Sequence, residues 1–290
     1  ESFPVPMTQW IGNDYPCAPA EVAMTYEDGI TTIRWDAVTL AEHDGYLNAA
    51  DVTYTVVRQP DGVRVVDNKK FTLFSEPIPE PEDFIEYYYT VVATHAGLSA
   101  EEVKSNAVRL GHCTIPYEET FTEADSFEYF TVLDANNDGY TWKAYNKQAR
   151  ISYNVAYKTV GMDDWLITPP MRLEAGQAYE FSMDAYTGET TCPERVEVYF
   201  GTSPNVGSMT RKIISATDLT QGFHPQRLKG EISVTTAGNY YFGIHACSDP
   251  DSYMLYVDNI SVVGGPDSNA PDAVGNLSVT PDAAGANSVT

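Results

Sequence analysis

The segment D-A-N-N-D-G at residues 134–139 has residue types and a spacing that could bind a metal ion. Asp134, Asn136 and Asp138 alternate along the chain, so their side-chain oxygens can point at one centre, while the glycine that follows permits a sharp turn. Such oxygen ligands suit Ca²⁺ in a structural role. An EF-hand would need Glu at the twelfth position, where this chain has Tyr145, so the segment is not an EF-hand. An ordinary Asn/Asp-rich turn is the alternative interpretation.

Four cysteines, at positions 17, 113, 192 and 247, could form disulfides or bind metal. No pair has the C-x-x-C spacing typical of zinc clusters. Cys192 precedes the strand-like stretch RVEVYF, and Cys247 follows the strand-like stretch YYFGIHA. Because the two sulfurs would meet if these strands are antiparallel neighbours, we predict a Cys192–Cys247 disulfide.

We find no combination of residues that is typical of a catalytic site. The five histidines lack a metal-ligand spacing such as HExxH, and the sequence contains neither a GxSxG elbow nor a Walker loop. His245 and Cys247 are two residues apart on a predicted strand and face one side, so they could form a nucleophile pair. A packed or exposed histidine beside a disulfide is the simpler interpretation, and we predict that the chain is not an enzyme.

The chain of 290 residues has a formal net charge of −24, from 41 acidic and 17 basic residues. This charge repels nucleic acid and anionic membranes, and it fits either divalent cation binding or simply a soluble extracellular surface. No apolar run approaches 18 residues, which argues against membrane insertion. The first ten residues do not resemble a signal peptide, as expected for a mature protein or part of one.

The elements that would position these residues are predicted to be strands. Period-two alternation of apolar and polar residues, separated by turn-forming clusters, indicates an all-β protein with little helix. The alternating stretches are 30–38, 51–59, 87–94, 178–186, 195–201, 239–246 and 253–263.

The motif A-P-x-x-V occurs at 18–22 and again at 270–274, each time after a polar linker. The second copy is followed by too few residues to bury a core, so we expect part of a tandem array. We divide the chain into residues 1–16, the tail of a preceding module or a linker, then domains at 17–111 and 112–264. Residues 265–290 would be a linker and the first strand of a further domain.

Residues 17–111 resemble a fibronectin type III domain, which implies a β-sandwich that often serves as a spacer. The matching residues are the A-P-x-x-V opening, Trp35, Tyr54, Val56, Tyr87, Tyr89, Val91, Ala93 and the segment 105–108. Trp35 would fill the space between two sheets.

Residues 115–264 resemble the cleaved-adhesin domain of gingipain-type haemagglutinin-adhesins. The matching pieces, in order, are E-E-T-F at 118–121, the acidic loop with Trp142, D-W-L-I-T-P at 164–169 and Y-V-D-N-I at 256–260. The resemblance implies a β-jelly-roll at the cell surface, adhesion to host proteins or glycans, and structural calcium. In jelly-rolls of this type an ion often pins the first strand to the last, which makes Glu119 and Asp258 further candidate ligands. A pair of surface acids is the alternative.

We therefore predict a non-catalytic adhesion or binding segment of a secreted or surface bacterial multi-domain protein. Its partners would be a host or environmental glycan or protein, and neighbouring modules of the same chain. Tyr186, Phe223 and Tyr253, in or near loops, are the candidate ligand-binding aromatics. The alternatives are a structural spacer and a carbohydrate-targeting accessory to a remote hydrolase or peptidase. Coplanar exposed aromatics would favour a sugar binder, and a featureless acidic surface would favour a spacer.

Overall fold

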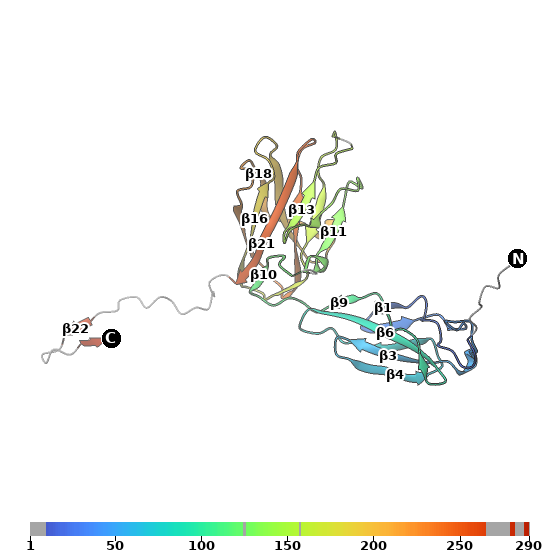
Figure 1. Cartoon of the computed structure of the whole chain (residues 1–290). Helices are drawn as coiled ribbons and strands as arrows, with labels where there is room; N and C mark the ends of the chain where they lie inside the picture. The colour runs from blue at the N-terminus through green and yellow to red at the C-terminus, as the bar shows by residue number, and fades with distance from the viewer. Residues whose placement is uncertain (1–9, 124–125, 157, 265–278, 282–286, 290) are drawn as a thin grey trace. The chain divides into compact units, whose positions relative to one another are not determined.

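The alternating stretches form antiparallel strands in a computed structural model that describes residues 10–123, 126–156, 158–264, 279–281 and 287–289. The described helical segments are the short 3₁₀ turns Ala49–Asp51, Ser126–Tyr129 and Val206–Ser208. The prediction of an all-β chain is therefore confirmed. Two units, residues 1–112 and 113–290, have separate sets of internal contacts and are coloured along the chain in Figure 1. No described helix is both long enough and apolar enough to cross a membrane.

Unit 1 contains two antiparallel sheets that share one core. One sheet is ordered β1 (Ala23–Glu27), β2 (Ile30–Arg34) and β5 (Leu73–Pro77). The other contains β4 (Val63–Lys69), β3 (Thr53–Gln59), β6 (Ile85–His95) and β7 (Leu98–Ser99), and β6 also pairs with β8 (Val103–Lys104) and β9 (Val108–Leu110). Trp35 lies in the core with its ring 5.4 Å from that of Tyr54. The predicted role of this tryptophan is confirmed.

Residues 10–16, which we had placed in a tail or linker, lie against the loop at 40–46 of unit 1. Asn13 bridges to Tyr46, and Pro16 bridges to Ala41. The repeated motif at 270–274 lies outside the described residues. The described segments beyond it, β22 (Val279–Pro281) and β23 (Asn287–Val289), pair as antiparallel strands.

Unit 2 is a sandwich of two antiparallel sheets. The first, here called the β21 sheet, is ordered β12 (Lys143–Ala144), β13 (Ala149–Ser152), β21 (Met254–Gly264), β16 (Ala178–Thr187) and β19 (Gln226–Ser233), with β10 (Tyr117–Glu119) also paired to β21. The second, the β20 sheet, is ordered β11 (Thr131–Asp134), β14 (Asp164–Ile167), β20 (Gly238–Ala246), β17 (Glu194–Gly201) and β18 (Arg211–Leu219), with β15 (Met171–Leu173) paired to β20. Figure 1 shows the two layers.

Alternation along each strand separates the core of unit 2 from its outer faces. Phe181 of β16 and Phe242 of β20 stack in the core at 4.9 Å. On β14, Leu166 joins this core, whereas Trp165 and Ile167 belong to a smaller buried cluster. Because neighbouring strand residues point to opposite faces, the smaller cluster lies on the outer face of the β20 sheet.

A bulge between β16 and β21 changes which residues of β21 face outward. The register shifts between Ser182 and Asp184, and Asn259 adopts a φ of 50°. Val257 and Ile260 both point into the core on either side of the bulge. Asp258 therefore points outward beside its cross-strand partner Asp184.

Candidate functional site

A row of aromatic and cationic side chains crosses the outer face of the β21 sheet. Tyr256 is the cross-strand partner of both Tyr186 on β16 and Arg150 on β13. The rings of Tyr186 and Tyr256 stack at 4.8 Å with an interplanar angle of 4°. The Arg150 guanidinium lies 3.8 Å from the ring centre of Tyr145, which is 40% exposed. Tyr256 is only 8% exposed, so the accessible ring surface of this row belongs to Tyr145 and Tyr186.

Polar groups lie beside this row on the same face. The Tyr186 hydroxyl donates to Gln148 Oε1 at 2.6 Å, and Gln148 Nε2 donates to Asp258 Oδ2 at 3.4 Å. Arg227 Nη1 contacts Asp184 Oδ1 at 3.3 Å. Burial raises the pKa of Asp258, and the charge of Asp184 acts in the same direction.

We name this surface the tyrosine face. Its members are Tyr145, Gln148, Arg150, Asp184, Tyr186, Arg227, Tyr256 and Asp258. It combines aromatic rings with amide, guanidinium and carboxylate groups, the combination from which sites for polar ligands are built.

The structure places two of the three predicted ligand-binding aromatics together. Tyr186 is part of the tyrosine face. Tyr253 is 37% exposed, and an added Cβ on Gly188 would lie 3.2–3.3 Å from the rings of Tyr253 and Tyr256. Phe223, 67% exposed in the loop between β18 and β19, contacts the end of β16 through its backbone N–H, 2.9 Å from the Thr187 carbonyl oxygen.

The predicted calcium loop is closed by its own hydrogen bonds. The Asp134 carboxylate accepts from the backbone N–H groups of Asp138 at 3.1 Å and Gly139 at 2.8 Å. The Asp138 carboxylate accepts from the Tyr140 N–H and from Asn154 Nδ2. Asn136 Nδ2 donates to the Gly161 carbonyl at 3.0 Å. These contacts are those of an Asx-type turn, which is compatible with either interpretation of the motif.

The sequence interpretation missed a third carboxylate next to this loop. Asp164 is the cross-strand partner of Asp134, is 1% exposed and has an Oδ1 atom without a hydrogen-bond partner. Burial raises its pKa to about 7, and the charges of Asp134 and Asp138 add to the effect. Among the described residues, none of these three carboxylates forms an ion pair with Lys or Arg. The D-W-L-I-T-P motif contains Asp164, but only strand pairing identifies its neighbour.

Glu119 and Asp258, the other predicted metal ligands, have different partners in the described structure. The Glu119 carboxylate accepts from the Phe121 N–H and, at 3.0 Å, from the Ser126 hydroxyl. Asp258 accepts from Asn259 and Gln148. The partner of Glu119 across β10 and β21 is Ile260, which points into the core, whereas the bulge turns Asp258 outward.

The predicted Cys192–Cys247 disulfide is not formed, since all four cysteines are free thiols. The strands are antiparallel neighbours, the condition on which the prediction depended, but the register places Cys247 opposite Arg195, with its N–H 3.0 Å from the Arg195 carbonyl. Cys192 lies in the loop before β17, three residues from Arg195, so the pairing of β17 with β20 does not place the two cysteines opposite each other.

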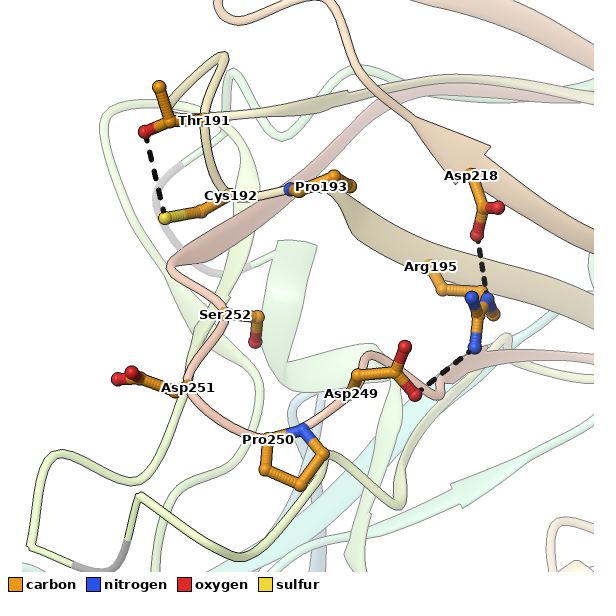
Figure 2. Close-up of a pocket in the computed structure, with 9 residues that line it drawn as sticks. All are labelled: Thr191, Cys192, Pro193, Arg195, Asp218, Asp249, Pro250, Asp251 and Ser252. Atoms are coloured by element: carbon orange, nitrogen blue, oxygen red, sulfur yellow. Dashed lines mark hydrogen bonds and ion pairs between the residues drawn. The ribbon is translucent and has the colours of Figure 1, made fainter.

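Cys192 instead lines a pocket between loops at one end of the sandwich (Figure 2). Arg195 in this pocket pairs with Asp218 at 2.7 Å and with Asp249 at 3.2 Å. Its charge is therefore neutralised within the protein, and the pocket is poorly suited to an anion.

No family model and no curated protein matches the chain. Among solved structures, it is similar to the K1 cleaved adhesin domain of Lys-gingipain from Porphyromonas gingivalis W83, at 16% identity and a TM-score of 0.40, covering 52% of this chain and 98% of that chain. It is also similar to the CBM22-1 xylan-binding domain from Paenibacillus barcinonensis Xyn10C, at 10% identity and a TM-score of 0.37, covering 51% and 92%.

A third similar structure, of FN3tt mut, has 10% identity and a TM-score of 0.24, covering 32% of this chain and 93% of that chain. Cleaved adhesin domains, the family that the sequence of unit 2 resembles, are thus among the structural neighbours of the chain. At these identities no residue role passes from the neighbours to this protein.

Proposed function

We propose that unit 2 is a non-catalytic binding module and that the tyrosine face binds a neutral glycan. The chain would then be a segment of a secreted or surface bacterial multi-domain protein. The observation that carries the proposal is the row in which Arg150 lies over the ring of Tyr145 and Tyr186 stacks on Tyr256, the cross-strand partner of Arg150.

The chemistry of the tyrosine face suits a sugar. The apolar C–H face of a pyranose ring packs on an aromatic ring, and its hydroxyls pair with amide and carboxylate groups. Gln148, Asp184 and Asp258 provide such groups beside the tyrosines. The net charge of −24 disfavours polyanionic glycans and so favours neutral ones.

The test is isothermal titration of the purified chain with a panel of neutral oligosaccharides. We expect Tyr145→Ala and Tyr186→Ala each to weaken binding by roughly tenfold or more, because central aromatic contacts contribute above 1 kcal/mol. Tyr46→Ala is the matched control, since this tyrosine is 61% exposed in unit 1. Phe223→Ala tests whether the exposed loop aromatic, rather than the tyrosine face, binds the sugar.

Two other results would redirect the assignment. Equal losses in Phe223→Ala and Tyr186→Ala would place the ligand at the end of β16. If the chain binds a protein and the tyrosine variants lose that binding, the tyrosine face remains the site, but its ligand is a protein instead of a glycan. A chain that binds no glycan and no protein would be a structural spacer.

We further propose that Asp134, Asp138 and Asp164 hold a structural Ca²⁺, with Asn136 as a neighbouring ligand. A buried carboxylate with an unpaired oxygen beside two further carboxylates supports the proposal, although the ligand atoms of the three do not all lie within 4.8 Å of one another and would have to close on the ion. The ion would neutralise this charge and join β11 to β14. The second predicted site, at Glu119 and Asp258, stays a prediction.

A further inference from the structure

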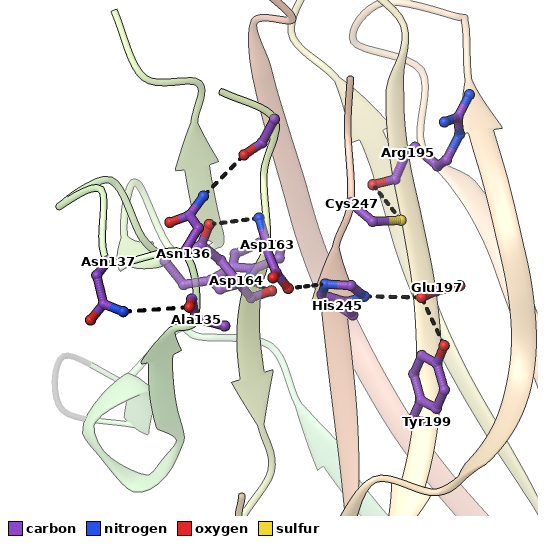
Figure 3. Close-up of polar contacts among 12 residues, drawn as sticks. Ala135, Asn136, Asn137, Asp163, Asp164, Arg195, Glu197, Tyr199, His245 and Cys247 are labelled. Atoms are coloured by element: carbon purple, nitrogen blue, oxygen red, sulfur yellow. Dashed lines mark hydrogen bonds and ion pairs between the residues drawn. The ribbon is translucent and has the colours of Figure 1, made fainter. Parts of the chain in front are cut away.

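Three side chains of different chemistry meet on the outer face of the β20 sheet. Glu197 on β17 is the cross-strand partner of His245 on β20, and Cys247 follows His245 by two residues. One ligand atom from each of the three residues lies within 4.8 Å of the others. Figure 3 shows the carboxylate, the imidazole and the thiol on one side of the two strands.

The His245 ring is held in one orientation from three directions. Its Nε2 atom lies 2.8 Å from Asp163 Oδ1, and its Nδ1 atom lies 3.0 Å from Glu197 Oε1. Trp165 stacks on the ring at 4.2 Å with an interplanar angle of 11°. Each ring nitrogen thus faces a carboxylate, Nε2 that of Asp163 and Nδ1 that of Glu197 (Figure 3), so a metal ion on Nδ1 would displace the proton that Nδ1 donates to Glu197.

Glu197 is set up as an anion although it is only 7% exposed. Burial opposes ionisation, but hydrogen bonds from Lys212, His245 and Tyr199 outweigh it and lower the pKa of the carboxyl. Lys212 contacts Oε2, whereas Oε1 faces His245 and the Tyr199 hydroxyl, so the two oxygens have separate roles.

We propose that Glu197 Oε1, His245 Nδ1 and Cys247 Sγ form a binding site for a divalent transition metal ion, with Zn²⁺ as the fitting example. Sulfur and imidazole nitrogen suit zinc, cobalt and related ions rather than Ca²⁺. Asp163 acts as the positioning residue, because a metal-bound histidine commonly donates its other ring N–H to a carboxylate. Three protein ligands leave a fourth position for water or an external ligand.

The geometry requires only small side-chain adjustments. Zinc–ligand distances are about 2.0–2.3 Å, so ligand atoms within 4.8 Å of one another can close on an ion through small rotations. Burial raises the pKa of the Cys247 thiol to about 12, so metal binding must release the thiol proton to solvent. Metal affinity should therefore increase as the pH rises.

The metal would link neighbouring strands of one sheet. It would bind β17 and β20 directly and fix Asp163, next to the start of β14, through the imidazole. The outer face of the β20 sheet would thus differ from the tyrosine face: one holds an ion and the other presents aromatic rings.

Titration of the full chain with Co²⁺, under reduction of the thiols, tests the site. We expect one Co²⁺ per chain and a near-ultraviolet thiolate-to-cobalt charge-transfer band that Zn²⁺ abolishes. Cys247→Ser should remove the band, and Asp163→Asn should weaken binding by roughly 10–100-fold. Cys192→Ser is the matched control, and Asp164→Asn separates this site from the calcium loop; both should keep the band.

The proposal is overturned if the wild-type chain shows no band, if Cys247→Ser keeps it or if Cys192→Ser removes it. A second measurement avoids variants altogether. Zn²⁺ should slow alkylation of Cys247 and leave the rate at Cys192 unchanged, as read by mass spectrometry of peptides. Equal alkylation of Cys247 with and without Zn²⁺ would contradict the assignment even if the variants did not fold.

Discussion

Asp14 in unit 1 and Asp164 in unit 2 are buried to the same degree and have opposite electrostatic properties. Their exposures are 0% and 1%. Burial opposes ionisation of Asp14, but its carboxylate accepts from His43 and from the backbone N–H groups of Gly45, His43 and Tyr15, which hold its pKa at about 2. Asp164 has an unpaired oxygen and two acidic neighbours, and its pKa is about 7.

This difference shows that hydrogen-bond and charge partners, rather than burial alone, decide whether a buried carboxylate is ionised. Unit 1 satisfies its aspartate with donors from its own loops. Unit 2 leaves one oxygen of its buried aspartate without a hydrogen bond and pairs this carboxylate with no Lys or Arg among the described residues. The first arrangement stabilises a loop, and the second forms a candidate ion site.

Removing the Asp14 carboxylate, which has its hydrogen-bond donors, should give the largest change in stability. We expect Asp14→Ala to lower the Tm of unit 1 by roughly 10 °C or more, because three backbone N–H groups lose their acceptor. Differential scanning calorimetry measures this shift. Glu42→Ala, an exposed acid in the same loop, is the control and should change little. A shift as small as that of the control would show that Asp14 does not hold the loop.

Adding Ca²⁺ should give the second-largest change in stability, in unit 2. Calcium at about 100 times its Kd contributes about 2.7 kcal/mol, which corresponds to roughly 5–10 °C for a domain of this size. We expect the transition of unit 2 to rise by this amount with Ca²⁺, to return with EDTA, and that of unit 1 to stay constant. Identical curves would remove the calcium assignment and leave the fold unchanged.

Neutralising Asp164 should change stability by a smaller amount, and with the opposite sign to the loss expected for Asp14→Ala. In EDTA at pH 8 we expect Asp164→Asn to stabilise unit 2 by about 1–2 kcal/mol and to abolish the calcium effect. The wild-type unit should lose stability as the pH rises from about 4 to about 7, since the folded state holds the Asp164 proton more tightly. Urea unfolding across this range measures both, and Glu231→Gln is the exposed control. A destabilised Asn variant would mean that the ionised carboxylate is already satisfied.

Lowering the pH should produce the smallest change in stability, and we expect this change in unit 1. A carboxyl whose pKa is lowered in the folded state contributes stability above its unfolded pKa of about 3.9 and loses it as the pH falls toward about 2. We expect the Tm difference between wild type and Asp14→Asn to be constant above pH 4 and to shrink by a few degrees between pH 4 and pH 2. His43→Ala should narrow this pH window, because it removes the largest of the contacts that lower the Asp14 pKa, by an amount that solvent reduces since the His43 side chain is 46% exposed. A constant difference down to pH 2 would mean that the Asp14 carboxyl is not the titrating group.

Four long strands of unit 2, β16, β17, β20 and β21, were predicted to within one residue at each end, whereas β18 and β19 were not among the predicted stretches. The stretches 195–201 and 239–246 became Glu194–Gly201 and Gly238–Ala246, because alternation of apolar and polar residues is a local pattern. The antiparallel pairing of these two strands, which the disulfide prediction took as its condition, is present in the structure. The disulfide prediction was wrong because it needed the register, which differs by three residues from what a Cys192–Cys247 bond requires.

The candidate sites were only partly predictable for the same reason. Tyr186 and the loop at 134–139 were singled out from their own residues. Tyr145, Arg150 and Asp164 were missed, since their significance lies in partners on other strands. The bulge at Asn259 also had no sequence signal that we recognised, although it decides the direction of Asp258.

By itself, the sequence determined that this chain is all-β, that Trp35 and the alternating apolar residues form cores, and that acidic residues cluster at 134–138. Only the tertiary structure decided that Asp164 faces Asp134, that Tyr186 stacks on Tyr256, and that Glu197 meets His245. The physical reason is that side-chain direction follows from local strand geometry, whereas contact between strands tens of residues apart depends on register, which packing of the whole sandwich selects.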